Sequence, residues 1–171
     1  MSGNDKDQVK NSNEFEANLF IKKIEALRSG SGSALGDFKI NVPGHYPGPG
    51  TPPYPGKQIL SGGVGHNPDR GVIGIGASPL VVPPGGDWLG LAIEIPATAT
   101  AGRYSFEKNP AVTGSVFWKW SGQYYLSGTI ISGTLIIKKI SLPLIFEARL
   151  EGVRLRSIDT PPCIEGEFKT Y

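Results

Sequence analysis

Apolar and polar residues alternate along much of this 171-residue chain. Alternation sends successive side chains to opposite faces of a strand, so each such segment is predicted to be a half-buried strand. Gly and Pro clusters separate these segments and supply the turns. The clearest examples are residues 36–42, 88–96, 103–107, 144–152, 153–158 and 164–171. About nine to ten short strands predict an all-β fold, an antiparallel β-sandwich or barrel.

The most apolar stretch, residues 114–140, is predicted to be a hairpin followed by a long strand. Ser121 and Gly122 separate two aromatic runs, and a small residue followed by Gly supplies the positive φ angles of a two-residue turn. Such a turn sets the cross-strand neighbours as Trp120 with Gln123, Lys119 with Tyr124, Trp118 with Tyr125, and Phe117 with Leu126. Further on, SGTII precedes SGTLII, which predicts a β-bulge at Gly133 or two short strands joined tightly.

Two alternatives are open for the faces of this hairpin. Alternation places Trp118, Trp120, Gln123 and Tyr125 on one face, and Phe117, Lys119, Tyr124 and Leu126 on the other. The first face can be an aromatic platform that stacks on sugar rings or anchors a protein partner. It can instead be core, with Lys119 and Tyr124 facing water, because three exposed aromatic side chains would favour aggregation.

The first 33 residues are predicted to form a separate region. Residues 1–12 are polar and are expected to be disordered, whereas the segment from Asn13 favours an amphipathic helix. Phe20, Ile24 and Leu27 form its apolar stripe, although an alternating strand pattern competes. SGSGS at 29–33 has the composition of a flexible tether. The helix either packs back on the β domain or docks on a partner or a second copy.

Residues 34–171 are predicted to form one β domain with a Pro/Gly-rich loop at 43–56. Ten of these fourteen loop residues are Pro or Gly, which excludes a helix and favours extended backbone. Two aromatic side chains, Tyr46 and Tyr54, lie in this loop. They join Trp118, Trp120, Gln123 and Tyr125 as predicted ligand-binding residues.

Composition narrows the classes of partner. Seventeen basic and fifteen acidic residues leave a net charge of +2, too small to predict nucleic-acid binding. No apolar run reaches the roughly 20 residues of a membrane span, and the polar start lacks signal-peptide features. With a single cysteine, Cys163, the chain as given is expected to be cytoplasmic. Secretion by a non-classical route stays open.

Catalytic chemistry has little support in the sequence. No nucleophile elbow, phosphate-binding loop or paired-cysteine metal motif occurs, so no catalytic residue, cofactor or metal site is predicted. His45 and His66, with Asp69, Asp87 or Cys163, would ligate a metal only if distant loops converged. Paired carboxylates of a glycosidase are the remaining enzymatic alternative. Their candidates are Glu147, Glu151, Glu165 and Glu167.

The order of motifs from about Trp88 onward resembles a group of small uncharacterised bacterial β-sandwich domains, many of them lipoproteins. Its motifs correspond here to Gly102-Arg103-Tyr104, Gly133-Thr134-Leu135-Ile136-Ile137, Phe146-Glu147-Ala148 and Gly166-Glu167-Phe168. The resemblance covers the C-terminal half and implies a β-sandwich without a known activity. The lipid-bearing cysteine of that group has no counterpart near the start of the chain.

These observations favour a non-enzymatic binding module, with carbohydrate or a protein surface as ligand. The contact region would be the aromatic hairpin together with the Pro/Gly-rich loop. A structural subunit that self-associates into a homo-oligomer through its N-terminal helix is the alternative, and a glycoside-acting enzyme is the third.

Overall fold

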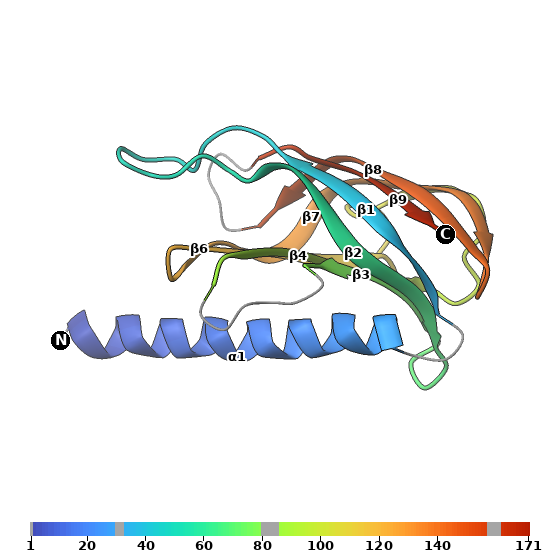
Figure 1. The fold of residues 1–171 in the computed structure, drawn as a ribbon, viewed down its shortest axis with the longest axis horizontal. Helices are drawn as coiled ribbons and strands as arrows, with labels where there is room; N and C mark the ends of the chain where they lie inside the picture. The colour runs from blue at the N-terminus through green and yellow to red at the C-terminus, as the bar shows by residue number, and fades with distance from the viewer. Residues whose placement is uncertain (1, 30–32, 80–85, 157–161) are drawn as a thin grey trace.

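The computed structural model describes residues 2–29, 33–79, 86–156 and 162–171, and within the helix it describes the side chains of residues 14–27 (Figure 1). One helix precedes nine strands in these ranges. They are α1 (Ser2–Ser29), β1 (Ala34–Val42), β2 (Gly56–Asn67), β3 (Val72–Ser78), β4 (Trp88–Pro96), β5 (Gly102–Ser105), β6 (Thr113–Trp120), β7 (Gln123–Ser141), β8 (Ile145–Leu155) and β9 (Ile164–Thr170).

Eight of the nine described strands close into an antiparallel barrel. Their order is β7-β6-β4-β3-β2-β1-β9-β8, and β8 pairs back with β7. The predicted antiparallel β fold with one N-terminal helix is confirmed, and it is a barrel rather than a sandwich. Closure pairs the outermost strands with each other and so removes exposed sheet edges.

The length of β7 makes this closure possible. Its first half pairs with β6, its second half pairs with the short β5, and β8 runs along its other side. Gly133 lies at the change of partner with a φ of 109°, and the pairing with β8 shifts register across it, between Ser132 and Thr134. The predicted bulge at Gly133 is therefore confirmed, and it bends one strand so that it serves two neighbours.

Alternating side chains fill the barrel interior. Phe38 and Phe168 pack with ring centroids 4.7 Å apart, and Phe146 is also fully buried. Alternation along the predicted strand at 144–152 would place Leu144 inward, on the same face as Phe146, but Leu144 is 72% exposed. The reason is that β8 begins at Ile145, which leaves Leu144 in the turn after β7.

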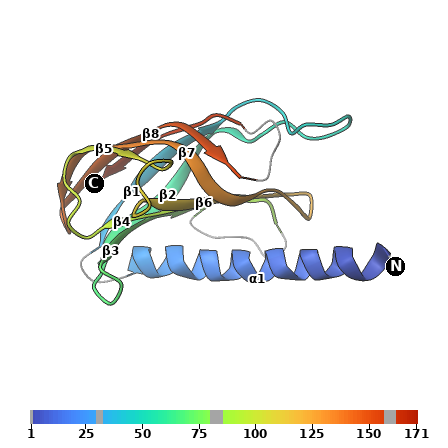
Figure 2. The same cartoon turned by 180° about the vertical axis from the view of Figure 1, so that it is seen from behind.

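Helix α1 lies along one outer face of the barrel (Figures 1 and 2). The predicted apolar stripe packs on that face, with Ala17, Phe20 and Ile24 buried and Leu27 half-buried. The helix begins at Ser2, whereas the sequence predicted disorder up to residue 12. Apart from Gly3, these residues include no helix breaker, and extending an existing helix adds one hydrogen bond per residue.

Glycines on the outer face allow the helix to approach the strands closely. A Cβ at Gly90 would lie 2.6 Å from the Phe20 ring, and one at Gly76 would lie 3.0 Å from the Ile24 side chain. The glycine on β3 thus has a packing role, since it leaves room for the helix side chains.

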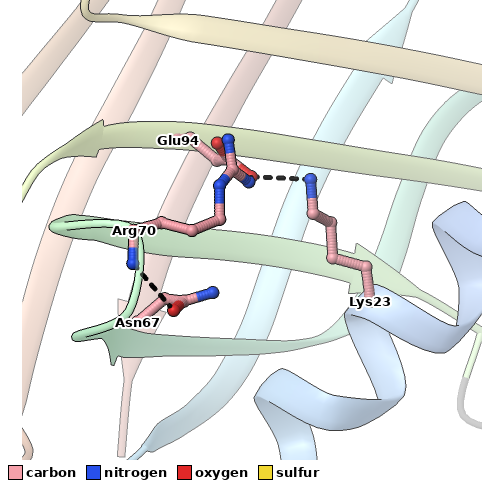
Figure 3. Close-up of polar contacts among 4 residues, drawn as sticks. All are labelled: Lys23, Asn67, Arg70 and Glu94. Atoms are coloured by element: carbon pink, nitrogen blue, oxygen red, sulfur yellow. Dashed lines mark hydrogen bonds and ion pairs between the residues drawn. The ribbon is translucent and has the colours of Figure 1, made fainter.

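Polar contacts also hold the C-terminal half of α1. Glu94 on β4 accepts hydrogen bonds from Lys23 of α1 and from Arg70 in the β2–β3 turn, each at 2.6 Å (Figure 3). Burial alone would raise the pKa of Glu94, but the hydrogen bonds and charges of the two cations lower it. The Arg70 amide donates to Asn67 Oδ1 at 3.3 Å, which fixes the turn.

Three predicted segments extend outside the described residues. They are the tether at 29–33, which includes residues 30–32, the strand at 153–158, which includes residues 157–158, and the disordered start, which includes Met1. Within the described part of the chain, no helix has the length and apolar character that crossing a membrane needs.

Candidate functional site

The turn of the β6–β7 hairpin has the predicted geometry. Ser121 and Gly122 have φ angles of 50° and 79°. Trp120 pairs with Gln123 and Lys119 pairs with Tyr124, as predicted. Beyond them an irregularity takes up one extra residue on β7, so that further pairs are shifted by one.

Because of this shift, two of the predicted cross-strand pairs and the predicted face of Leu126 are wrong. Trp118 pairs with Leu126 instead of Tyr125, and Phe117 pairs with Ser127 instead of Leu126. Leu126 therefore shares the barrel interior with Trp118, rather than the opposite face with Phe117. Tyr125, the extra residue, stays near Trp118 with ring centroids 5.6 Å apart.

Both faces of the hairpin are partly covered. Trp118 is buried in the barrel core, whereas Trp120 near the tip is 41% exposed. On the other face, Phe117 and the half-buried Tyr124 pack against Trp88 and α1. The core interpretation thus holds for Trp118, and Trp120 keeps a surface available to a ligand.

Lys119 was expected to face water, but it is buried under α1. Its Nζ lies 2.9 Å from Glu14 Oε1 and 5.4 Å from the centroid of the Tyr124 ring. Burial, followed by the charge and hydrogen bond of Glu14, raises the pKa of Tyr124 to about 12. Glu14 therefore interacts with both residues and ties the helix to the back of the hairpin.

The Pro/Gly-rich loop folds over the same end of the barrel. It forms an extended hairpin in which the Tyr54 amide donates to the Gly44 carbonyl at 2.9 Å. The Thr51 hydroxyl contacts the carbonyl oxygens of Tyr46 and Gly48, each at 2.6 Å. The loop and the β6–β7 hairpin project from the end opposite to the C-terminus (Figures 1 and 2).

Five of the six predicted ligand-binding residues form one connected aromatic cluster. Tyr125 is at its centre, with ring centroids 5.0 Å from Tyr46 and 6.1 Å from Trp120. The Tyr54 ring contacts both Tyr46, at 6.3 Å, and Trp118, at 5.7 Å. The loop and hairpin predictions thus converge in space, although whether these residues bind a ligand stays a prediction.

A groove of about 420 Å³ opens beside this cluster. Trp120, Trp118 and Tyr54 line it, and Trp88 from β4 also belongs to its lining, although the Trp88 ring packs against Phe20, Phe117 and Tyr124 on the other face of the hairpin. The remaining lining residues are Pro53, Pro55, Gln58, Leu60, Pro79, Asp87 and Leu89. Tyr46 and Tyr125 support the lining rings from behind, and the sixth predicted residue, Gln123, is exposed at the turn next to Trp120.

Two polar side chains that line the groove each have one acceptor atom that is not used in a hydrogen bond. Asp87 Oδ1 accepts a hydrogen bond from the Ser121 amide at 2.7 Å, and Gln58 Nε2 donates to the Pro55 carbonyl at 3.0 Å. Among the described residues, neither Asp87 Oδ2 nor Gln58 Oε1 has a hydrogen-bond partner.

Tyr54 adds a third polar group. Its hydroxyl oxygen is buried and has no hydrogen-bond partner among the described residues. Burial, and then the nearby Tyr46, raise the pKa of Tyr54. A buried hydroxyl without a partner costs free energy, so a ligand that reached it would regain a hydrogen bond.

Sequence reasoning missed Trp88, Asp87 and Gln58. All three belong to segments that alternation marked as strands or turns, and their local pattern carries no sign of a site. The pairing of β4 with β6 brings Asp87 and Trp88 beside the hairpin, and Gln58 comes from β2, on the other side of β3.

The other candidate chemistries are not assembled in the described structure. His45 pairs with Pro53 in the loop, whereas His66 lies at the far end of β2. No group of three or more His, Cys, Asp or Glu side chains that could hold a metal occurs in the described ranges. Glu147 and Glu151 form ion pairs with Lys139 and Arg149, respectively.

No protein-family model, curated protein or solved structure matches this chain. The resemblance to bacterial lipoprotein-associated domains therefore stays a prediction from the sequence motifs.

Proposed function

We propose that this protein is a non-enzymatic carbohydrate-binding module whose site is the groove at the aromatic end of the barrel. The observation that carries the proposal is the exposed Trp120 ring at a groove that Trp118, Tyr54 and Asp87 also line. An aromatic face stacks on the apolar C–H face of a sugar ring, and carboxylate and amide oxygens accept hydrogen bonds from its hydroxyls.

The shape of the site favours a saccharide over a protein surface. Small-ligand sites are concave, commonly about 300–1,000 Å³, with a few polar groups among apolar ones. The groove of about 420 Å³ is of this kind. Asp87 and Gln58 supply unpaired acceptors from two different segments, which suits a ligand with several hydroxyl donors.

Self-association through α1 is the second candidate. Phe15 and Leu19 are 65% and 53% exposed on the helix and would be available to a partner. However, the apolar stripe formed by Ala17, Phe20 and Ile24 is already occupied by the helix's own barrel. For this reason we place the groove first.

Binding to a glycan array, followed by calorimetry on each positive saccharide, tests the proposal. Trp120→Ala is expected to weaken binding by roughly 10- to 30-fold, the loss expected of a central aromatic contact. Phe15→Ala, which removes an exposed aromatic ring elsewhere, serves as the matched control and should bind normally. The proposal fails if no saccharide binds, or if Trp120→Ala binds as tightly as the wild type.

A further inference from the structure

The outer face of β1, β9 and β8 lies on the side of the barrel away from α1 (Figures 1 and 2). The helix contacts β2, β3 and β4. Since α1 is the one helix in the described ranges, none of the described helical structure covers the second face. Its outward side chains are therefore available to a partner.

Strand pairing gathers these outward side chains into rows that cross the strands. One row contains Asp37 on β1, Lys169 on β9, Glu147 on β8 and Lys139 on β7. The charges alternate in sign along the row. Lys139 and Glu147 are 4.0 Å apart, whereas Lys169 forms no ion pair with either neighbour among the described residues.

The row nearest the C-terminus is apolar and exposed. The Tyr171 amide donates to the Leu35 carbonyl at 2.9 Å, and Ile145 holds the equivalent place on β8, two residues before Glu147. Leu35, Tyr171 and Ile145 are 43%, 84% and 47% exposed, and Leu144 lies next to them in the turn. Contiguous exposed apolar side chains of this kind mark interaction surfaces.

A third row lies on the other side of the charged row. Lys39, Glu167 and Arg149 stand opposite one another on β1, β9 and β8. Beyond them, Glu165 and Glu151 carry the same charge. From the C-terminal end, the face thus carries one apolar row and two rows of alternating charge, whereas the row of Glu165 and Glu151 is acidic.

We propose that β8 and β9 form a contact surface for a second copy of this chain. The two copies would be related by a two-fold axis that runs parallel to the strands, between β8 and β9. This rotation reverses each row. A residue on β9 therefore faces the residue of the same row on β8 of the other copy, and a residue on β1 faces one on β7. Tyr171 then meets Ile145, Lys169 meets Glu147, Glu167 meets Arg149, and Asp37 meets Lys139.

Each of these four meetings is favourable, whereas in the next row Glu165 meets Glu151, a like-charge contact that opposes association at that end of the surface. The charged row has four members of alternating sign, and the rotation reverses their order. Each charge therefore faces one of opposite sign on the other copy, which makes the row complementary to itself. The apolar row meets itself. A two-fold relation that reversed the strand direction would instead place the apolar row against Glu165 and Glu151.

The contact area limits the strength of this dimer. Because the barrel surface is curved, we expect only β8, β9 and their immediate neighbours to meet, as in transient interfaces that bury less than about 1,200 Å². The dimer is therefore weak and sensitive to salt. Since the axis is parallel to the strands, both aromatic grooves point in the same direction, which suits simultaneous binding to one polymer.

Sedimentation equilibrium of the full chain tests the interface. The wild type is expected to approach twice the mass of a single chain as its concentration rises, and about 1 M salt should reverse this. Lys169→Glu and Glu147→Lys each set like charges against each other, so the dissociation constant of each variant should rise at least tenfold.

Mixing the two variants distinguishes an interface from damage to the fold. In an equimolar mixture each contact between Lys169→Glu and Glu147→Lys chains again joins opposite charges, so heterodimers should form. Asp37→Lys with Lys139→Asp gives an independent pair should either variant fail to fold. A wild type that stays at the mass of a single chain, variants that dimerise as before, or mixtures no heavier than their components would each overturn the proposal.

Discussion

Glu14 and Lys119, 105 residues apart in the chain, form a partly buried ion pair of 2.9 Å between α1 and β6. Lys119 stands between Trp118 and Trp120, so the contact holds the back of the strand whose front lines the groove. The helix thus belongs to the support of the candidate site. This relationship leads to the first prediction.

Removing Glu14 should destabilise the fold, because it leaves the buried Lys119 ammonium without its partner. Glu14→Gln is expected to lower the free energy of unfolding by about 1–3 kcal/mol in urea denaturation. Adding Lys119→Met should recover much of this loss. Glu16→Gln, an exposed glutamate two residues away, is the control and should have little effect. Equal losses for Glu14→Gln and Glu16→Gln would contradict this role.

Tyr124 should make stability depend on alkaline pH. Its pKa is raised from 10.0 to about 12, so the folded state keeps the phenol protonated where the unfolded state ionises. The stabilisation is fully present below pH 10 and is lost as the pH rises from 10 toward 12. Tyr124→Phe should lack this part of the pH dependence. Tyrosinate absorbance should show one late-titrating group fewer in the variant; an unchanged titration would refute the assignment.

Gly90 should be intolerant of any side chain. A Cβ there would lie 2.6 Å from the Phe20 ring and 2.9 Å from the Trp88 ring, so Gly90→Ala must displace one of these buried rings and is expected to cost about 1–3 kcal/mol in urea denaturation. A double-mutant cycle with Phe20→Ala checks the cause. If the clash is with Phe20, the two losses will combine to less than their sum; additive losses would point elsewhere.

Tyr54→Phe should separate stability from binding. The hydroxyl has no hydrogen-bond partner among the described residues, so its removal is expected to change the free energy of unfolding by less than about 1 kcal/mol. Saccharide affinity should nevertheless fall if the ligand reaches this hydroxyl. Thermal unfolding and calorimetry of the same sample measure both. A clear loss of stability would mean that the hydroxyl is already satisfied.

Local chemistry was sufficient to predict several elements of the fold. The Ser121-Gly122 turn and the Gly133 bulge follow from the φ angles that these residues permit, and alternation identified most inward-facing positions. Pairing beyond the turn could not be predicted. Tyr125 and Leu126 are both large and apolar, so nothing local shows which of them the bulge absorbs.

The candidate site was predictable only in part. The aromatic residues of the loop and hairpin were identified by their type, and the structure brings five of them together. Asp87 and Trp88 could not be assigned to them, because their position depends on β4 lying beside β6. The burial of Lys119 likewise depends on where α1 docks, which sequence periodicity does not specify.

The indole N–H resonances of the three tryptophans test the central claim most directly. Trp118 and Trp120 line the groove and report on the site, whereas the Trp88 ring packs against Phe20 and Phe117 under α1 and serves as the reference signal. On titration with a saccharide that binds the array, we predict that the signals of Trp118 and Trp120 shift together and saturably, with the larger shift at the exposed Trp120. Saturable binding that leaves the indole signals of both Trp118 and Trp120 unmoved would contradict the proposed site.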